Sequence, residues 1–420
     1  MNILLTLRQP LVPADTGGKV RSLNIFSRLA KRASIHAVSF ADPVHEAAPI
    51  AEMKHIFESY TPVAWHESTK YSPAFYAEVL ASQLGSWPYF LSKCNRLEFV
   101  STVRVLARRH RFDLLFCDFL HTAAPLVSFP FAPKIVFEHN VEFLLRKRKC
   151  AVETNPIRRT ILKNEWMKTR VIEKRVCRNC DGLLVVSEDD RQTMLREFGV
   201  ANVSVLPTGV DTEFFQPSQF PSRQGRIVFV GSMDWDPNED GIAWFLRDVY
   251  PRIRQSVPHA SLAVVGRNPS PRLRALAAHQ PDVKLTGRVP DVRPYLAEAE
   301  VVIVPLRVGG GTRIKIPEAM AMSKAVVSTT IGAEGLPFRN SREISIADKA
   351  EDFAETVITL LRDPQMRKAI ASAARNVVVE KHGWEAVVAR MEEAIDAAVN
   401  SATAPEQLPS ANSSPEQLYA

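Results

Sequence analysis

The sequence of 420 residues has no long hydrophobic run. A helix that crosses a membrane needs about 20 consecutive apolar residues, and no uncharged apolar stretch approaches that length, so an integral membrane protein is not expected. The opening run Ile3–Leu7 stops at Arg8 and Pro10, and no basic segment precedes it. It therefore predicts a buried first strand and not a signal peptide.

Cysteine is scarce, and its spacing excludes a disulfide framework. The five cysteines form no even, regular pattern, and Cys177 and Cys180 alone have C-x-x-C spacing. One such pair without a second pair or nearby histidines is weak support for a zinc site. We expect no metal and a reduced chain in the cytoplasm.

Several familiar binding signatures are missing as well. No G-x-x-x-x-G-K-[ST] loop is present, and no G-x-G-x-x-G follows the first strand. The chain also lacks a helix-turn-helix, RRM or zinc-finger pattern, so nucleic acid is not an expected partner. Hydrophobic residues make up 46% and charged residues 24% of the chain, which is ordinary globular composition. The length suits two domains of about 150 residues or more each.

Positive charge is concentrated in one segment. The formal net charge is +7, yet residues 146–178 alone hold twelve Lys and Arg against three Glu. Ile161, Trp166, Met167, Val171, Ile172 and Val176 could form an apolar stripe on a helix there, with the bases outside it. The segment is either a solvated helix face or a dock for anionic membrane lipid or a phosphate-bearing acceptor.

Short apolar runs alternate with helical patterns in the first half, as in a parallel α/β sheet. Expected strands are Ile3–Leu7, Ile35–Phe40, Leu114–Cys117, Ile135–Phe137, Gly182–Val186 and Val203–Leu206. The stretch 214–225 has no periodicity and reads as a linker. The alternation then restarts, with strands expected at Ile227–Val230, Ser261–Val265, Val283–Thr286, Val301–Pro305, Ala325–Ser328 and Ile344–Ile346 and a helix over Ile242–Val257.

A restart of this kind indicates two doubly wound domains with a cleft between them, because ligands bind outside the carboxyl ends of the strands in such sheets. The sequence predicts an N-terminal domain over 1–207, a linker over 208–225 and a C-terminal domain over 226–382. A crossover helix over 383–400 and a disordered tail over 401–420 follow.

The most informative segment begins after the run that ends at Pro305. Gly309, Gly310 and Gly311 are followed by Thr312 and a predicted helix. Glycines let backbone N–H groups approach a ligand closely, and a helix N-terminus favours an anion.

Arg313 and Lys315 place two cations in the first turn of that helix, which suits the helix dipole only if an anion such as a pyrophosphate is bound. Glu318 lies three residues after Lys315, on the same helical face, where a carboxylate can accept hydrogen bonds from a ribose diol. The segment therefore favours a nucleoside diphosphate over the alternative, a plain strand-to-helix turn with a surface Lys–Glu pair.

These residues resemble the GT-B glycosyltransferases, specifically the retaining glycosyltransferase family 4, over nearly the whole ordered chain. The resemblance rests on the segments 17–18, 138–140, 185–188, 206–211, 229–231, 286–287 and 309–321 and on Trp384. The chain looks most similar to bacterial sugar transferases of exopolysaccharide or surface-glycan assembly. The implied fold is GT-B: two Rossmann-like domains that face a central cleft, with a C-terminal crossover helix.

The resemblance implies roles for these residues. The C-terminal domain would bind a nucleotide-sugar donor, with Glu318 on the ribose and the phosphates on the 309–312 loop and Gly231. Arg313 or Lys315 would stabilise the departing diphosphate, with Arg267 as a helper. No divalent metal and no other cofactor is implied. Two departures stand out: Gly310 occupies a position that holds Glu in the family, and residues 232–235 lack its usual Arg.

In the N-terminal domain, the resemblance places an acceptor- or sugar-contacting residue at His139, with a structural histidine as the alternative. Gly17 and Gly18 would bring backbone N–H groups near the diphosphate, unless they form only a tight turn. Asp234, Trp235 and Asn238 either face the cleft and select the sugar or form a structural turn.

The predicted function is retaining, metal-independent transfer of a hexose from a nucleotide diphosphate to a lipid-linked or polysaccharide acceptor. The enzyme would act in the cytoplasm, at the inner face of the membrane, with residues 146–178 as a peripheral contact. Two alternatives are a nucleotide-sugar epimerase of the same fold and a non-catalytic scaffold that binds sugar nucleotides.

Overall fold

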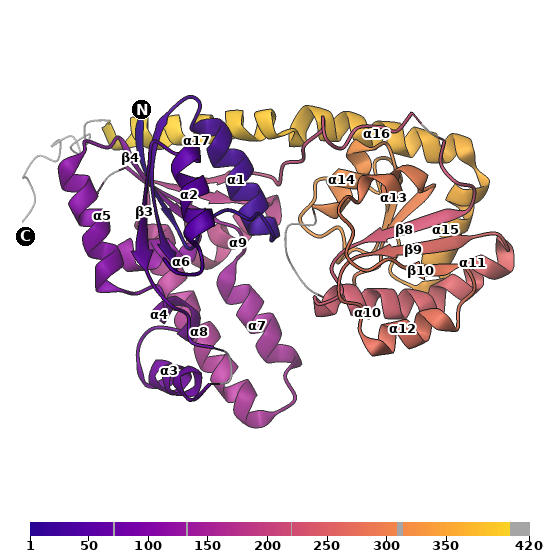
Figure 1. Cartoon of the computed structure of the whole chain (residues 1–420), viewed down its shortest axis with the longest axis horizontal. Coiled ribbons are helices and arrows are strands. Elements are labelled where there is room, and N and C mark those ends of the chain that lie inside the picture. The colour runs from indigo at the N-terminus through magenta and orange to yellow at the C-terminus, as the bar shows by residue number, and fades with distance from the viewer. Residues whose placement is uncertain (70–71, 132, 220, 309–313, 404–420) are drawn as a thin grey trace, which may run out of the picture.

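The molecule is built around two parallel β-sheets, one in each domain. The computed structural model describes residues 1–69, 72–131, 133–219, 221–308 and 314–403. A seven-stranded sheet has the order β3-β2-β1-β4-β5-β6-β7, and a six-stranded sheet has the order β10-β9-β8-β11-β12-β13. Each sheet carries helices on both faces, and the two domains lie side by side (Figure 1). Both strand orders reverse direction beside the first strand of the domain, which is the doubly wound α/β arrangement. The predicted fold class is confirmed.

The strands of the N-terminal domain fall where short apolar runs predict them, with one addition. All six expected strands are present, and the sequence interpretation missed β3 at the sheet edge, where Pro62 and partly buried polar residues interrupt the apolar pattern. The seven strands are Asn2–Leu7, Ser34–Ala41, Ser59–Ala64, Leu114–Asp118, Lys134–Glu138, Gly182–Val185 and Val203–Val205.

The helices of this domain connect the strands and fill both faces of the sheet. The helices α1 to α9 are Gly17–Leu29, Ala47–Ile56, Pro73–Leu84, Tyr89–Ser92, Leu97–Arg109, Leu120–Ala123, Glu142–Val152, Pro156–Arg178 and Glu188–Phe198, and a 3-10 turn spans Ala124–Leu126. Helix α1 begins at Gly17, because the Thr16 side chain accepts a hydrogen bond from the backbone of Lys19 and caps the helix.

The second domain repeats the plan with shorter strands. Strands β8 to β13 are Arg226–Val230, Ser261–Val265, Val283–Leu285, Val301–Val304, Ala325–Ser328 and Ser345–Ile346, at the predicted places. Helices α10 to α15 are Asp236–Trp244, Tyr250–Ser256, Pro271–Ala278, Arg293–Glu298, Lys315–Ala321 and Ala350–Arg362. The single helix expected over 242–257 is divided by a π-helical turn at Phe245–Val249, just before Pro251, which has no N–H to continue the ladder.

The last two helices run along one side of both domains (Figure 1). Helix α16, Pro364–His382, packs against α14 and β12 of the second domain, whereas α17, Trp384–Thr403, packs against α1, β5 and β6 of the first. The chain therefore crosses back to the domain in which it began. The helix extends through Thr403, past the predicted start of the tail, and the rest of that tail lies outside the described residues.

Helices α3, α4, α7 and α8 form a lobe that projects from the first domain (Figure 1). The basic segment 146–178 belongs to this lobe, but the predicted apolar stripe is wrong in part: Met167 is 49% and Val171 68% exposed, while Glu165, Thr169 and Glu173 are buried. The buried face of α8 is polar because its side chains hydrogen-bond to neighbouring backbone. The carboxylate of Glu173, for example, accepts from the first two N–H groups of α7.

The central strands are buried throughout, which is why they read as continuous apolar runs. The five cysteines are buried and unpaired. Within the part of the chain that the structure describes, no helix combines the length and apolar character needed to span a bilayer.

Candidate functional site

A cavity of about 420 Å³ lies between the two domains. Its N-terminal wall combines residues at the carboxyl ends of β5, β6 and β7 with residues of helices α7 and α9. Its C-terminal wall is the segment 334–337, and the end of α16 together with Arg390 of α17 closes it. Of the predicted site residues that the structure describes, His139 alone lines this cavity.

The expected donor site lies elsewhere, at the point where the strand order of the C-terminal sheet reverses. Gly231 follows β8, and Lys315 begins α14 after the adjacent strand β11. A Cβ atom on Gly231 would come within 2.7 Å of Lys315 Nζ and 2.8 Å of Asn238 Nδ2. Glycine at position 231 therefore makes room for the lysine.

The ammonium group of Lys315 is held in place by its neighbours. It donates to Asn238 Oδ1 at 2.7 Å and lies 4.5 Å from the centre of the Phe229 ring, in a cation–π contact. Asn238 is fixed in turn because its Nδ2 donates to the carbonyl of Ser232 at 2.7 Å. Asn238 is 3% exposed, so its structural alternative fits better than a sugar-selecting role.

Glu318 follows Lys315 by three residues on α14 and is half-buried. Loss of water raises the pKa of its carboxyl group to about 7, against the opposing charge of Lys315. No hydrogen bond or ion pair to this carboxylate is found within the described ranges. A half-buried carboxyl group without partners beside a fixed ammonium group is suited to receive polar groups of a ligand.

Arg267 is close to this point but already engaged. Its Nε donates to Ser232 Oγ at 3.0 Å and to Asp234 Oδ2 at 3.1 Å. The preceding residue, Gly266, packs so closely that a Cβ would overlap the carbonyl of Gly231. Arg267 and Asp234 thus hold the turn after β8 against the turn after β9.

The glycine loop itself lies outside the described residues. Gly309, Gly310, Gly311, Thr312 and Arg313 belong to the segment 309–313, so their predicted contacts with phosphate stay predictions.

His139 is the centre of a buried polar chain in the N-terminal domain. Its Nε2 lies 2.7 Å from Asp118 Oδ1, and its Nδ1 lies 3.1 Å from Arg21 Nη1. Because a guanidinium group can only donate, Nδ1 must be the acceptor and Nε2 must carry the proton. Burial lowers the pKa of His139 despite the nearby Asp118, which fits this neutral ring. Both ring nitrogens are therefore engaged within the protein, as in the structural alternative.

Arg21 and Asp118 were missed by the sequence interpretation. Arg21 is fully buried, and burial lowers its pKa to about 10; its second nitrogen donates to Thr208 Oγ1 at the domain junction. Ser22 Oγ donates to Asp118 Oδ2 at 2.7 Å. The one available signal was the polar pair Arg21 and Ser22 on a helix face that otherwise carries Ile25, Phe26 and Leu29.

Gly17 and Gly18 form the first turn of α1, and Gly18 has a clear packing role. A Cβ on Gly18 would lie 2.8 Å from Cζ of Phe119. The Phe119 ring stacks on His139 with centres 3.7 Å apart, and its backbone has a positive φ of 71°. Glycine at position 18 thus permits the ring that holds the histidine.

Glu138, which precedes the histidine, is a second unexpected feature. It is 1% exposed, and its Oε1 has no hydrogen-bond partner in the described chain. Burial, together with the neighbouring carboxyl groups of Glu173 and Glu142, raises its pKa well above the ordinary value. The raised pKa favours the protonated form of this carboxyl group.

An ion pair spans the inter-domain cavity. Arg148 of α7 donates to Glu334 of the second domain, with Nη2 2.9 Å from Oε1. Both side chains line the cavity. Part of the predicted basic segment therefore contacts the other domain.

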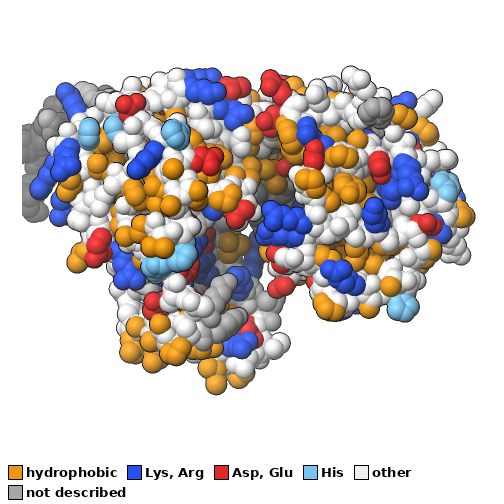
Figure 2. Space-filling view, viewed as in Figure 1, with side chains coloured by type: hydrophobic (Ala, Val, Ile, Leu, Met, Phe, Trp, Pro, Cys, Tyr) orange, Lys and Arg blue, Asp and Glu red, His pale blue; other side chains and the backbone are white. Residues whose placement is uncertain are grey.

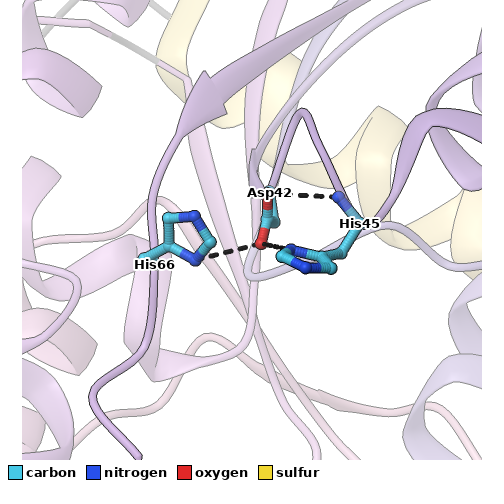
Figure 3. A group of neighbouring side chains, drawn as sticks. All are labelled: Asp42, His45 and His66. Carbon is cyan, nitrogen blue, oxygen red and sulfur yellow. Dashed lines mark hydrogen bonds and ion pairs between the residues drawn. The ribbon is translucent and has the colours of Figure 1, made fainter.

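One group on the surface has the composition of a metal site (Figure 3). Asp42 Oδ2 lies 2.6 Å from His45 Nδ1 and 3.0 Å from His66 Nδ1. Asp42 also accepts from the backbone N–H groups of Val44 and His45, and these hydrogen bonds lower its pKa. The two rings are largely exposed, and none of the three residues lines a cavity described here. The structure does not connect this group with the site.

Two family descriptions match the chain in succession. Residues 61–214 match "Glycosyltransferase Family 4", and residues 224–363 match "Glycosyl transferases group 1". The first match ends and the second begins within the predicted linker region.

Curated relatives are distant. An uncharacterized 44.6 kDa protein in the cps region of Klebsiella pneumoniae is 21% identical over 291 residues, which is 67% of this chain and 74% of that protein. A phosphatidyl-myo-inositol mannosyltransferase of Mycobacterium tuberculosis is 27% identical over 226 residues. That alignment spans 50% of this chain and 58% of the mannosyltransferase.

Solved structures match over almost the whole chain. HepE of Anabaena, in complex with UDP and glucose, has a TM-score of 0.66 at 13% identity and covers 94% of this chain and 99% of its own. Sucrose-phosphate synthase of Thermosynechococcus elongatus has a TM-score of 0.64 at 16% identity and covers 94% and 98%. At such identities the likeness establishes the fold.

Proposed function

Because this chain belongs to the GT-B glycosyltransferases, we propose that it moves a sugar from a nucleotide diphosphate to a glycan or lipid-linked acceptor. The transfer retains the anomeric configuration and uses no metal, as the resemblance to glycosyltransferase family 4 implies. The acceptor belongs to exopolysaccharide or surface-glycan assembly. The cps-region relative supports this setting.

The arrangement of Gly231, Lys315 and Glu318 carries the proposal. Lys315 is oriented by Asn238 and Phe229 at the reversal point of the C-terminal sheet, where doubly wound folds bind ligands. Glu318 lies one helical turn further on, without a partner in the described structure. The diphosphate would lie on Lys315 and the ribose on Glu318.

This geometry also suits the chemistry of the bond that breaks. When the bond between the sugar and the diphosphate cleaves, negative charge grows on the β-phosphate oxygen. A cation that is already fixed in position stabilises that charge without reorganisation. In our proposal Lys315 supplies one such cation and Arg313 the other, whereas Arg267 is largely neutralised by Asp234.

The donor base and sugar are best approached by a screen. Several curated relatives are named mannosyltransferases, three of them GDP-mannose-dependent, whereas the HepE structures contain UDP or UDP-glucose. A thermal-shift screen of UDP-, GDP- and ADP-sugars would identify the donor, because a ligand at 100 times its Kd adds about 2.7 kcal/mol of stability.

The decisive variant is Glu318→Gln, compared with Glu355→Gln on the exposed face of α15. We expect Glu318→Gln to weaken binding of the donor found in the screen by about tenfold or more, since a hydrogen bond to a charged group contributes about 1.5–3 kcal/mol. Glu355→Gln should bind as the wild type does. Wild-type affinity in Glu318→Gln, measured by calorimetry, would refute the site.

Turnover distinguishes the alternatives. Conversion of donor alone to an isomerised sugar would indicate an epimerase. Tight donor binding without transfer to any acceptor pool would indicate a non-catalytic scaffold. Sharp loss of transfer in Arg313→Ala, with the fold retained, is expected of a glycosyltransferase that uses this loop.

We further propose that the lobe formed by α3, α4, α7 and α8 contacts the membrane face. Its exposed surface combines the basic residues of α8 with large apolar side chains, among them Leu80 at 65%, Leu84 at 88% and Ile157 at 73% exposure. Hydrophobic side chains gather at the tip of this lobe (Figure 2). Apolar groups beside cations are the composition of a peripheral contact with anionic lipid.

A further inference from the structure

A second cavity, of about 290 Å³, lies in the N-terminal domain. It is built from residues that follow three neighbouring strands: Arg8 after β1, His121 after β4, and Glu142 after β5. The strand order reverses between β1 and β4. The cavity therefore occupies the reversal point of the first sheet, as the expected donor site does in the second.

Four cations line this cavity: Arg8, Lys93, Arg146 and Lys149. Two of them are paired, since Lys93 contacts Glu67 and Arg146 contacts Glu142. The side chains of Arg8 and Lys149 have no hydrogen-bond or ion-pair partner within the described ranges. Glu142 is the single acidic residue of the lining, so the cavity carries a clear excess of positive charge.

The cavity also contains a buried, partly unsatisfied histidine. His121 is 8% exposed, and its Nδ1 has no hydrogen-bond partner among the described residues. Burial and the charges of Arg8 and Arg146 lower its pKa well below the ordinary value. The ring is thus neutral and can donate or accept a hydrogen bond.

Aromatic side chains fix the cations on one wall. The guanidinium of Arg146 lies 3.3 Å from the centre of the Phe90 ring, and Lys93 Nζ lies 4.3 Å from that of Tyr89. Phe90 also meets His121 edge-on, at 5.2 Å between ring centres. Groups held in this way need little reorganisation when an anion enters.

The second cavity adjoins the inter-domain one. Leu145 of α7 lines both, and Arg148, one turn along the same helix, lines the inter-domain cavity. A ligand anchored in the second cavity could therefore extend along α7 toward the cleft between the domains.

We propose that the second cavity binds the phosphate or diphosphate group of the acceptor. This inference rests on the proposed transferase function and specifies its acceptor as a phosphorylated one. A phosphate ester accepts several charge-assisted hydrogen bonds, and arginine offers it a planar pair of donors. Four cations, two of them without carboxylate partners, match a multiply charged phosphate group better than a single carboxylate.

The test uses inorganic pyrophosphate as the probe, titrated into the full chain by calorimetry at low salt. Arg8→Gln and Lys149→Gln should each weaken its binding by about tenfold or more. Lys147→Gln is the matched control, because Lys147 is an exposed cation on the same helix that lines neither cavity. It should change the affinity by less than about twofold. Circular dichroism melting verifies that each variant folds.

Three outcomes would overturn the proposal. The first is that pyrophosphate shows no saturable binding, and the second is that Lys147→Gln loses as much pyrophosphate affinity as the cavity variants do. The third is that Lys315→Gln loses affinity while Arg8→Gln does not, which would place the pyrophosphate at the donor site. Nucleotide affinity is measured separately. If the wild type binds no nucleotide but binds pyrophosphate through Arg8 and Lys149, the proposed donor site is refuted and the phosphate site in the second cavity is supported.

Two arms distinguish the source of the phosphate. A soluble sugar 1-phosphate represents a free acceptor, and neutral vesicles doped with a polyprenyl diphosphate represent a lipid-linked one. Dependence on Arg8 and Lys149 in either arm supports the site, and the tighter arm identifies the form of the acceptor. Independence in both arms would overturn it.

Discussion

At the scale of single residues, burial of the Glu318 carboxyl group affects both stability and the proposed donor binding. Its pKa is raised to about 7 because the half-buried group is poorly hydrated. The raised value favours the protonated form in the folded protein. The native state therefore loses stability relative to the unfolded chain as the pH rises from about 4.5 to about 7, and the loss is complete above that range.

Donor binding should have the opposite pH dependence. In the proposed site a ribose diol donates to the ionised carboxylate, so donor affinity should rise by up to about tenfold between about pH 6 and pH 8, as Glu318 loses its proton. Calorimetric titrations with the donor nucleotide at both pH values measure this change. Glu318→Gln is the control, since its remaining pH dependence belongs to the nucleotide alone. Equal pH dependence in both proteins would contradict the role of Glu318.

At the scale of elements, helix α17 packs against the first domain and holds the C-terminal crossover segment there. Trp384, the first residue of α17, is 4% exposed and packs with the core of the N-terminal domain. Gly209, in the segment that follows β7, lies directly against its ring, and a Cβ there would overlap that ring and come within 2.6 Å of Cδ2. The tight packing explains why glycine occurs in the turn cluster 207–211.

Gly209→Ala should therefore destabilise the protein by about 1–3 kcal/mol, the usual cost of an extra methyl group in a packed interior. Urea denaturation followed by tryptophan fluorescence measures the free energy of unfolding. Gly85→Ala is the comparison, because the nearest atom to its Cβ would be 3.5 Å away, in ordinary contact. Equal free energies of unfolding in the two variants would show that the Trp384 ring can move aside without destabilising the protein.

At the scale of the whole molecule, positive charge is distributed in an unexpected way. The basic segment 146–178 serves three surfaces: Arg146 and Lys149 line the second cavity, Arg148 contacts Glu334 across the inter-domain cavity, and α8 lies on the outer lobe. The sequence showed one basic helix. The structure divides it into α7 and α8, with a break at residues 153–155.

Membrane contact should depend on the apolar tip of the lobe as well as on charge. The double variant Leu80→Ser and Leu84→Ser should bind vesicles containing phosphatidylglycerol at least about tenfold more weakly, since burying one leucine contributes about 1.5–3 kcal/mol. Leu97→Ser is the control, because Leu97 is 85% exposed on α5, outside the lobe. Sedimentation at low salt, where charge attraction is strongest, measures binding. If the wild-type protein does not bind such vesicles, the proposed membrane contact is excluded.

The sequence by itself determined the fold and most of its strands, because a buried parallel strand is a short apolar run whose end is marked by polar residues or glycine. The sequence also predicted the candidate nucleotide site, because Lys315 and Glu318 are neighbours along one helix and their spacing is a local property. The edge strand β3 was missed because Pro62 and the partly buried polar residues Ser59 and Thr61 weaken the apolar pattern.

Only the tertiary structure decided which distant residues meet. Arg21, Asp118 and His139 are far apart in the chain and form one buried network, which engages both nitrogens of the histidine. Arg8, His121 and Lys149 meet in the second cavity. The physical reason is that parallel strands bring their carboxyl ends to one edge of the sheet whatever the length of chain between them, so long-range juxtaposition depends on strand order, which local sequence patterns do not encode.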